Sequence, residues 1–151
     1  MSKPCIFCDI VEGKQPVSII YEDQSFMIIM DAYPLSKGHC LVLPKQHLVR
    51  LDQLSSKERT RLFELGFLVN ESQKANQLGV NGTNILLNDG KAANQTVPHL
   101  HLHLIPRQTG DLLKTLPRLA LHISGLFGLK TKRKQLDEQA NALRKTLTID
   151  L

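Results

Sequence analysis

Residues 98–105, which read PHLHLHLI, decide the expected fold. Successive side chains of a β-strand point to opposite faces of its sheet. The alternation therefore predicts a strand over residues 97–105, with His99, His101 and His103 on one face and three leucines on the other. The leucine face indicates contact with a core, and the histidine face indicates a site of chemistry.

Three interpretations of the histidine face are open at this point. The face could be the solvated side of an amphipathic strand, although threonine or lysine would serve equally well there. His99 and His101 could bind one metal ion, as alternate strand histidines can. Alternatively, one neutral imidazole could attack phosphorus while the others neutralise phosphate oxygens, because an ordinary pKa of about 6.5 leaves histidine largely unprotonated at neutral pH.

The rest of the sequence predicts an antiparallel sheet of about five strands with one long helix packed on it, an α+β fold. A short helix is expected at residues 6–12. Ser55 followed by Glu58 has the pattern of a helix N-cap, and apolar residues then recur at helical spacing, which predicts a helix over residues 56–77. Apolar and β-branched runs predict four further strands, over residues 18–21, 25–30, 39–43 and 84–88.

The chain after Arg107 differs in character from the part before it. Four of the five residues in 130–134 are basic, and apolar residues within 136–147 line one face of a predicted helix. We therefore expect a domain over residues 1–107 and a C-terminal extension over residues 108–151, with a basic cluster and an amphipathic helix. The cluster is interpreted as a solvated helix start, and contact with phosphates of a nucleic acid or a polyphosphate substrate is the alternative.

The composition indicates one globular domain. The chain has 151 residues, of which 42% are hydrophobic and 22% charged. The apolar stretch at residues 119–129 is shorter than the roughly 20 residues of a membrane-spanning helix, and the N-terminus lacks a signal-peptide core. We therefore expect a cytoplasmic protein without membrane contact. The net charge of +5 suits ligands that carry phosphates, whereas the scarcity of aromatic residues argues against a nucleic-acid partner.

Three cysteines are an odd set that cannot all pair within one chain. In a reducing compartment, the spacing Cys5-x-x-Cys8 fits a metal or redox site better than a structural disulfide. A closed tetrahedral zinc site needs two more ligands. Cys40 is interpreted as a buried strand residue.

The flanks of the histidine strand resemble a known family. Residues 94–107, NQTVPHLHLHLIPR, resemble the signature of the histidine triad (HIT) family, His-φ-His-φ-His-φ-φ with φ apolar. Asp31 and residues 38–47, GHCLVLPKQH, resemble the second block of that family. The resemblance covers roughly residues 5–107 and leaves the tail outside. It implies a HIT-like fold, a homodimer and hydrolysis of a nucleotide, with adenine as the expected base.

The resemblance implies a role for each histidine of the site. His101 would be the nucleophile that takes a nucleotidyl group, and water would then release a nucleoside monophosphate such as AMP. His39 and His103 would stabilise charge at the α-phosphate, and His99 completes the catalytic set. The substrate would be a dinucleoside polyphosphate or a nucleoside phosphoramidate. The related hexose-phosphate uridylyltransferases have glutamine at the position of His103, so histidine there favours hydrolysis over transfer to a sugar phosphate.

Four further residues match positions at which the family binds substrate. Asp31 would hold the ribose hydroxyls, since a carboxylate accepts from two donors at once. Asn88, Gln95 and Thr96 would hold phosphate oxygens. Asn94 departs from the family pattern, which has glycine there; if the position needs a positive φ, asparagine is the next best tolerated residue.

The resemblance also implies a structural zinc ion. Many bacterial members of the family pair an N-terminal Cys-x-x-Cys with two histidines, and the matching positions are Cys5, Cys8, His47 and His99. Four protein ligands would leave no open coordination position for a catalytic water. The alternative is a pair of small buried cysteines beside two surface histidines.

Two other functions are weighed against the hydrolase. One is a nucleotide-sensing protein that binds AMP without meaningful turnover, which the unassigned basic tail favours. The other is a zinc-dependent nucleic-acid binder that uses Cys5, Cys8 and the basic cluster. Within the tail, residues 126–129 are expected to reach the active site in a dimer.

Overall fold

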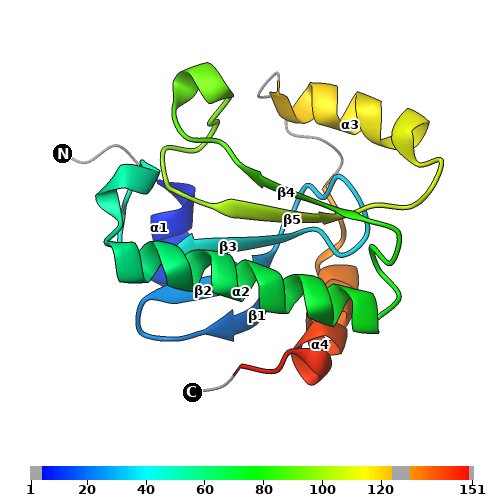
Figure 1. The fold of residues 1–151 in the computed structure, drawn as a ribbon, viewed down its shortest axis with the longest axis horizontal. Coiled ribbons are helices and arrows are strands. Elements are labelled where there is room, and N and C mark those ends of the chain that lie inside the picture. The colour runs from blue at the N-terminus through cyan, green and yellow to red at the C-terminus, as the bar shows by residue number, and fades with distance from the viewer. Residues whose placement is uncertain (1–4, 124–129, 150–151) are drawn as a thin grey trace.

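The computed structural model describes residues 5–123 and 130–149. Within these residues, five strands form one antiparallel sheet in the order β1-β2-β3-β5-β4. The predicted strands and the long helix are all present, so the α+β prediction is confirmed (Figure 1). The strands are β1 (Ile19–Glu22), β2 (Phe26–Met30), β3 (Cys40–Pro44), β4 (Thr83–Leu87) and β5 (Leu102–Pro106).

Helices pack on this sheet and extend beyond it. In Figure 1 the long helix α2 crosses the sheet, α4 lies beside β1, and α3 lies beyond β4. The predicted tail residues 126–129 lie outside the described ranges. The helices are α1 (Ile6–Val11), α2 (Ser56–Ala75), α3 (Leu112–Ile123) and α4 (Arg133–Thr146), with short 3-10 helices η1 (Leu51–Gln53) and η2 (Lys91–Ala93).

The larger hydrophobic core lies between the sheet and the helices α2 and α4. Sheet residues such as Ile28, Val42 and Leu102 pack there with Leu62 and Leu65 of α2. The apolar face of α4 completes the same core through Leu136, Ala140 and Leu143. The division at residue 107 remains a prediction, but this helix of the extension is part of the same packed unit as the sheet.

A smaller core lies on the opposite face of the sheet, under α1. Phe7 packs there against Ile29, Leu41 and Leu43, which alternate along their strands with residues of the larger core. Because side chains alternate along a strand, His103 of β5 points toward this second face while its neighbours Leu102 and Leu104 enter the larger core. The alternation along β5 therefore places the side chain of His103 on the face of the sheet that α1 covers.

Helix α2 begins and packs as its sequence predicts. The Ser55 hydroxyl accepts a hydrogen bond from the Glu58 N–H at 3.3 Å, and the Glu58 carboxylate accepts one from the Ser55 N–H at 2.8 Å. This capping box satisfies two backbone donors at the helix start. Midway along the helix, a Cβ on Gly66 would lie 2.8 Å from Leu102 Cδ2, so glycine allows α2 to approach β5 closely.

The fifth strand starts later than predicted. It spans Leu102–Pro106 rather than residues 97–105. Pro98 has no N–H to donate to a neighbouring strand, and the carbonyl of Val97 accepts a hydrogen bond from the N–H of His99 in a tight turn. His99 and His101 therefore lie on an irregular segment before the strand, and only His103 lies on the strand itself.

Helix α3 was not expected from the sequence. Leu112, Leu113, Leu116 and Leu121 are exposed, whereas Thr115 is buried. The apolar side of this helix therefore faces away from the fold, and its polar side faces the body of the protein. Among residues 5–123 and 130–149, no helix combines the length and apolar character needed to cross a membrane.

Candidate functional site

A cavity of about 420 Å³ opens on the α1 side of the sheet, where the histidines lie. His101 and His103 line it together with Asp31 and Thr96. Apolar side chains form most of the remaining wall; they include Ile6, Ile10, Val17, Ile29 and Leu41. A mostly apolar hollow with a few convergent polar groups is typical of a small-molecule site.

The backbone fixes the protonation of His101. Its Nδ1 lies 2.6 Å from the carbonyl oxygen of His99, which can only accept, so Nδ1 carries the proton. The lone pair of the neutral ring is therefore on Nε2. Phe7 packs edge-on against the same ring, with the centroids 5.0 Å apart, and helps to hold its orientation.

A second chain of hydrogen bonds fixes His103. The Leu35 N–H donates to His39 Nδ1 at 3.1 Å, so the proton of His39 is on Nε2. That atom lies 2.9 Å from His103 Nδ1 and donates to it, which leaves the proton of His103 on Nε2. His101 and His103 therefore present opposite functions, a lone pair on one and an N–H donor on the other, with ring centroids 4.8 Å apart.

The hydrogen-bond chain from Leu35 through His39 to His103 is called the histidine relay below. Asp31 is a buried carboxylate beside it. It accepts a hydrogen bond from the Tyr33 N–H at 2.8 Å, and its Oδ2 lies 3.6 Å from His39 Nε2. It lines the cavity, as does Thr96. The two predicted substrate-binding residues thus lie with the histidines.

Asn88 and Gln95 do not line the cavity in the described part of the chain. The Gln95 side chain accepts from the Gly90 N–H and donates to the Val49 carbonyl, so it braces the loop that follows β4. Their contact with substrate remains a prediction. Asn94 has a φ of 59°, so the position does require the left-handed conformation, and asparagine adopts it.

Two cavity residues, Lys130 and Arg133, come from the C-terminal extension. Arg133 donates to the Ser18 hydroxyl at 3.0 Å and to the Pro16 carbonyl at 2.7 Å, which holds the start of α4 over the loop before β1. The basic character of residues 130–134 was a usable signal in the sequence. The sequence did not show that these side chains reach the cavity, because only the packing of α4 brings them there.

A cysteine and histidine cluster lies next to the cavity. The ligand atoms of Cys5, Cys8, His47 and His99 all lie within 4.8 Å of one another. The Cys5 and Cys8 sulfurs lie 3.5 Å and 3.7 Å from His99 Nδ1, and the Cys8 sulfur lies 3.1 Å from His47 Nδ1. A tetrahedral zinc ion would separate sulfur from nitrogen by about 3.6 Å, so this donor set fits zinc.

The surroundings of His99 suit a metal ligand. Its Nε2 lies 2.8 Å from the Pro44 carbonyl and must donate to it, so Nδ1 presents a lone pair to the sulfurs. Burial lowers the pKa of His99 to about 4, which keeps the ring neutral. Burial, with the neighbouring Cys5, raises the pKa of Cys8 to about 11, so a bound cation would have to displace the thiol proton.

Cys40 is separate from this cluster. It is fully buried in β3, its thiol donates to the Gly38 carbonyl at 3.1 Å, and burial raises its pKa to about 12. Its prediction as a buried strand residue is confirmed. Such a thiol is an inert packing group.

Comparison with known proteins places the chain in a family. Residues 12–110 match the family model described as HIT domain. The chain belongs to the HIT family. It is 38% identical over 103 residues to the adenosine 5'-monophosphoramidase hnt1 of Schizosaccharomyces pombe, covering 68% of this chain and 74% of the relative. It is 35% identical over 123 residues to the adenylylsulfatase HINT3 of Arabidopsis thaliana, covering 81% of this chain and 61% of the relative.

A solved HIT structure also resembles the chain over nearly its whole length. It is the crystal structure of a zinc-bound histidine triad family protein from Mycobacterium smegmatis, 34% identical in sequence. The TM-score is 0.72, and the match covers 95% of this chain and 92% of that chain. That HIT protein therefore has the same fold and holds zinc.

Proposed function

We propose that the protein is a nucleotidyl hydrolase that releases a nucleoside monophosphate, such as AMP, from a dinucleoside polyphosphate or a nucleoside phosphoramidate. The observation that carries this proposal is the pairing of His101 and His103 in one cavity, with a lone pair on one ring and an N–H donor on the other. The names of the two curated relatives, a monophosphoramidase and an adenylylsulfatase, support a hydrolase of this class.

His101 would attack the α-phosphorus through Nε2. The phosphorus–nitrogen bond to His101 forms as the bond to the leaving group breaks, and the leaving group departs with the electron pair of that bond; the leaving nitrogen of a phosphoramidate also takes up a proton from water. Water then attacks the nucleotidyl-histidine, which restores His101 and yields the nucleoside monophosphate. Splitting one displacement into two steps is the advantage of covalent catalysis.

His103 would donate from Nε2 to a phosphate oxygen as negative charge develops there. His39 would act through His103, because its own proton is committed to His103 Nδ1. His99 would contribute by positioning, because its backbone carbonyl orients the His101 ring. Its own ring belongs to the cysteine and histidine cluster.

The remaining polar residues would bind the substrate. Asp31 would accept hydrogen bonds from the ribose hydroxyls, and Asn88, Gln95 and Thr96 would hold phosphate oxygens. The apolar wall of the cavity suits a flat base such as adenine, which packing rather than charge would hold. Lys130 and Arg133 would favour the negative charge of the phosphates.

Cys5, Cys8, His47 and His99 would hold a structural zinc ion, which would supply a crosslink rather than chemistry. With four protein ligands it has no open coordination position. The crosslink would join the N-terminus to the segment that carries His101, two residues after His99.

A homodimer is proposed on the exposed apolar surface. The edge strand β4 exposes Ile85 and Leu86, and α2 exposes Phe63 and Phe67. An edge strand with apolar side chains invites pairing unless it is covered. A second copy would cover it with a two-fold axis, the commonest symmetry of soluble oligomers.

The test is product analysis over a nucleotide panel. Wild-type protein should release AMP from adenosine phosphoramidate or a diadenosine polyphosphate, and His101→Ala should lose at least about 10³-fold in rate because the nucleophile is gone. Lys57→Ala, on the exposed start of α2, is the control and should keep full activity. Tight AMP binding with no turnover on any substrate would instead identify a nucleotide sensor and would contradict the proposal.

A further inference from the structure

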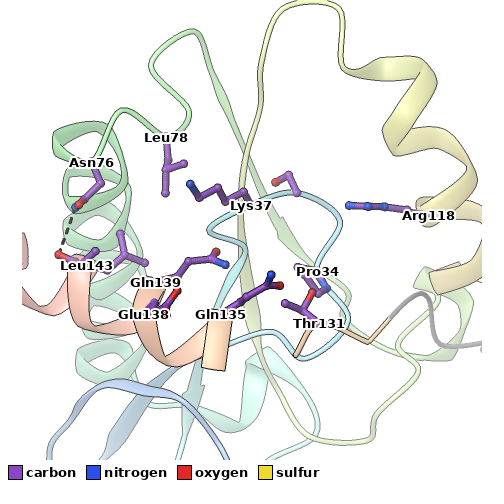
Figure 2. A pocket seen from close by; sticks show the side chains of 12 residues that line it. Pro34, Lys37, Asn76, Leu78, Arg118, Thr131, Gln135, Glu138, Gln139 and Leu143 are labelled. Carbon is purple, nitrogen blue, oxygen red and sulfur yellow. Dashed lines mark hydrogen bonds between the residues drawn. The ribbon is translucent and has the colours of Figure 1, made fainter. Parts of the chain in front are cut away.

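A second cavity, of about 580 Å³, has a lining that shares no residue with that of the histidine cavity. Its walls are the loop at residues 34–37, the residues that follow α2, helix α3 and helix α4. Figure 2 shows Lys37, Arg118, Gln135 and Gln139 around the same hollow, which Leu78 and Leu143 also line. We call this the α4 cavity. None of the residues with a proposed role in hydrolysis lines it.

The charges that face the α4 cavity are mostly positive and not neutralised. Neither Lys37 nor Arg118 forms an ion pair with any residue in the described ranges. Other basic residues of the chain do, for example Arg50 with Asp89 and Lys45 with Glu22. Unpaired cations that line one concave surface raise the local concentration of anions.

An adjoining hollow of about 160 Å³ extends this positive region. Lys37 and Arg118 line both spaces, and Lys114 adds a third cation. Asp111 also lines the smaller hollow, but it is held by Arg107, whose side-chain hydrogen bond lowers the pKa of Asp111 to about 2. Glu138 is the acidic residue on the wall of the larger cavity. In the α4 cavity itself, two cations against Glu138 leave an excess of one positive charge, and Lys114 of the adjoining hollow raises the combined excess to two.

Neutral donors face the same space. The Gln139 side-chain oxygen accepts from the Gly38 N–H at 2.9 Å, so this side chain is fixed with its NH₂ group as its remaining function. Gln135, one helical turn earlier on α4, contributes a second amide to the wall. Lysine, arginine and amide donors beside apolar lining residues are suited to bind an oxyanion that is attached to a small organic body.

We propose that the α4 cavity binds a small molecule with a phosphomonoester group, at a site distinct from the histidine cavity. A phosphomonoester carries a charge of about −1.5 to −2 at neutral pH, and the walls of the α4 cavity and the adjoining hollow together carry an excess of two positive charges. Arg118 would bind its oxygens through two parallel N–H groups, Lys37 would add a point charge, and Gln135 and Gln139 would complete the donor set.

The bound anion would also bear on the histidine relay, and this consequence rests on the proposed function. Gly38 donates to Gln139 on the cavity wall, and its neighbour His39 accepts from the Leu35 N–H. The segment that contacts the anion thus orients the ring that donates to His103. The site is a candidate for an effector that tunes the catalytic ring from outside its cavity.

Titration of ¹⁵N-labelled full-length protein with inorganic phosphate tests the proposal. The chloride control has the same ionic strength. The side-chain NH₂ signals of Gln135 and Gln139 and the amide of Gly38 should shift in a saturable way. Lys37→Met with Arg118→Met should weaken this response at least about tenfold, because the variant removes both cations that would form charged hydrogen bonds to the phosphate.

Three matched comparisons make the outcome decisive. Glu138→Gln should strengthen phosphate binding because it removes a like charge, and Lys57→Met should change nothing. The Thr96 amide reports phosphate in the histidine cavity and should respond equally in the double variant. The readout needs no turnover, so it stands even if the hydrolase proposal fails. Unmoved Gln135 and Gln139 signals, an unchanged response in the double variant, or equal binding of malonate would overturn the phosphomonoester site.

Discussion

Two backbone groups determine which nitrogen carries the proton in each of the two histidines of the cavity. The His99 carbonyl places the proton of His101 on Nδ1, and the Leu35 N–H, acting through His39, places the proton of His103 on Nε2. One ring therefore offers a lone pair and its neighbour offers a donor at the same pH. The hydrogen bonds select the two tautomers.

This division predicts how substitutions of His103 differ. His103→Ala removes a donor to the phosphate oxygens and should lower kcat about 10²–10³-fold, the usual effect of losing one such donor. His103→Gln keeps an N–H donor of similar reach and should lose clearly less. Steady-state kinetics on the preferred nucleotide measure both. Equal losses in the two variants would show that His103 acts by something other than donation.

At the scale of elements, the cysteine and histidine cluster joins three separate parts of the chain. Cys5 and Cys8 flank the start of α1, His47 follows β3, and His99 precedes β5. The sequence indicated the cysteine pair by its spacing alone. The two histidines could be named only from the family resemblance, because nothing local relates residues 47 and 99 until the sheet brings them together.

Removal of one thiol tests the zinc site. Wild-type protein should bind close to one equivalent of zinc and release protons as it does so, since the thiol of Cys8 has a pKa of about 11 without metal. Zinc affinity should therefore fall as pH falls. Cys8→Ser should lose the metal and melt at a lower temperature, and Cys40→Ala should keep the metal because Cys40 lies outside the cluster. Wild-type protein without zinc after purification in zinc-containing buffer would contradict the site.

Two elements escaped the sequence for different reasons. The strand β5 was extended too far because the alternation of histidine and leucine continues through a turn at Val97 and Pro98 that is not a strand. Helix α3 contains Pro117, which disfavours a helix, so local propensity did not predict it. Its exposed leucines face away from the fold, so the helix also lacks the buried apolar face that is typical of a packed helix. The spacing of Leu112, Leu116 and Leu119 was the available signal.

At the scale of the whole molecule, alternation and capping predicted the sheet, its larger core and the long helix. Those features depend on residues close together in sequence. The cavity depends on the path of the chain after residue 107, which brings Lys130 and Arg133 beside the histidines. The α4 cavity likewise lies where α3, α4 and the 34–37 loop meet, so it could not be predicted from the sequence alone.

The exposed edge of the sheet leads to a prediction for assembly. Ile85→Glu places a charge on β4 where a second copy is expected to pack, so the dimer should dissociate at least about tenfold more readily. Analytical ultracentrifugation measures the dissociation constant, with Lys57→Glu as an exposed control on α2. A wild-type monomer at micromolar concentration, or a dimer unaffected by Ile85→Glu, would show that this edge is not the interface.

During turnover, His101 is proposed to become covalently nucleotidylated. Mixing enzyme with its preferred nucleotide, quenching in alkali to preserve the acid-labile phosphorus–nitrogen bond, and digesting the protein for mass spectrometry tests this directly. We expect a peptide with a nucleoside monophosphate attached at His101, present in wild type and absent in His101→Ala. Turnover without any such adduct, or an adduct on another residue that persists in His101→Ala, would contradict it.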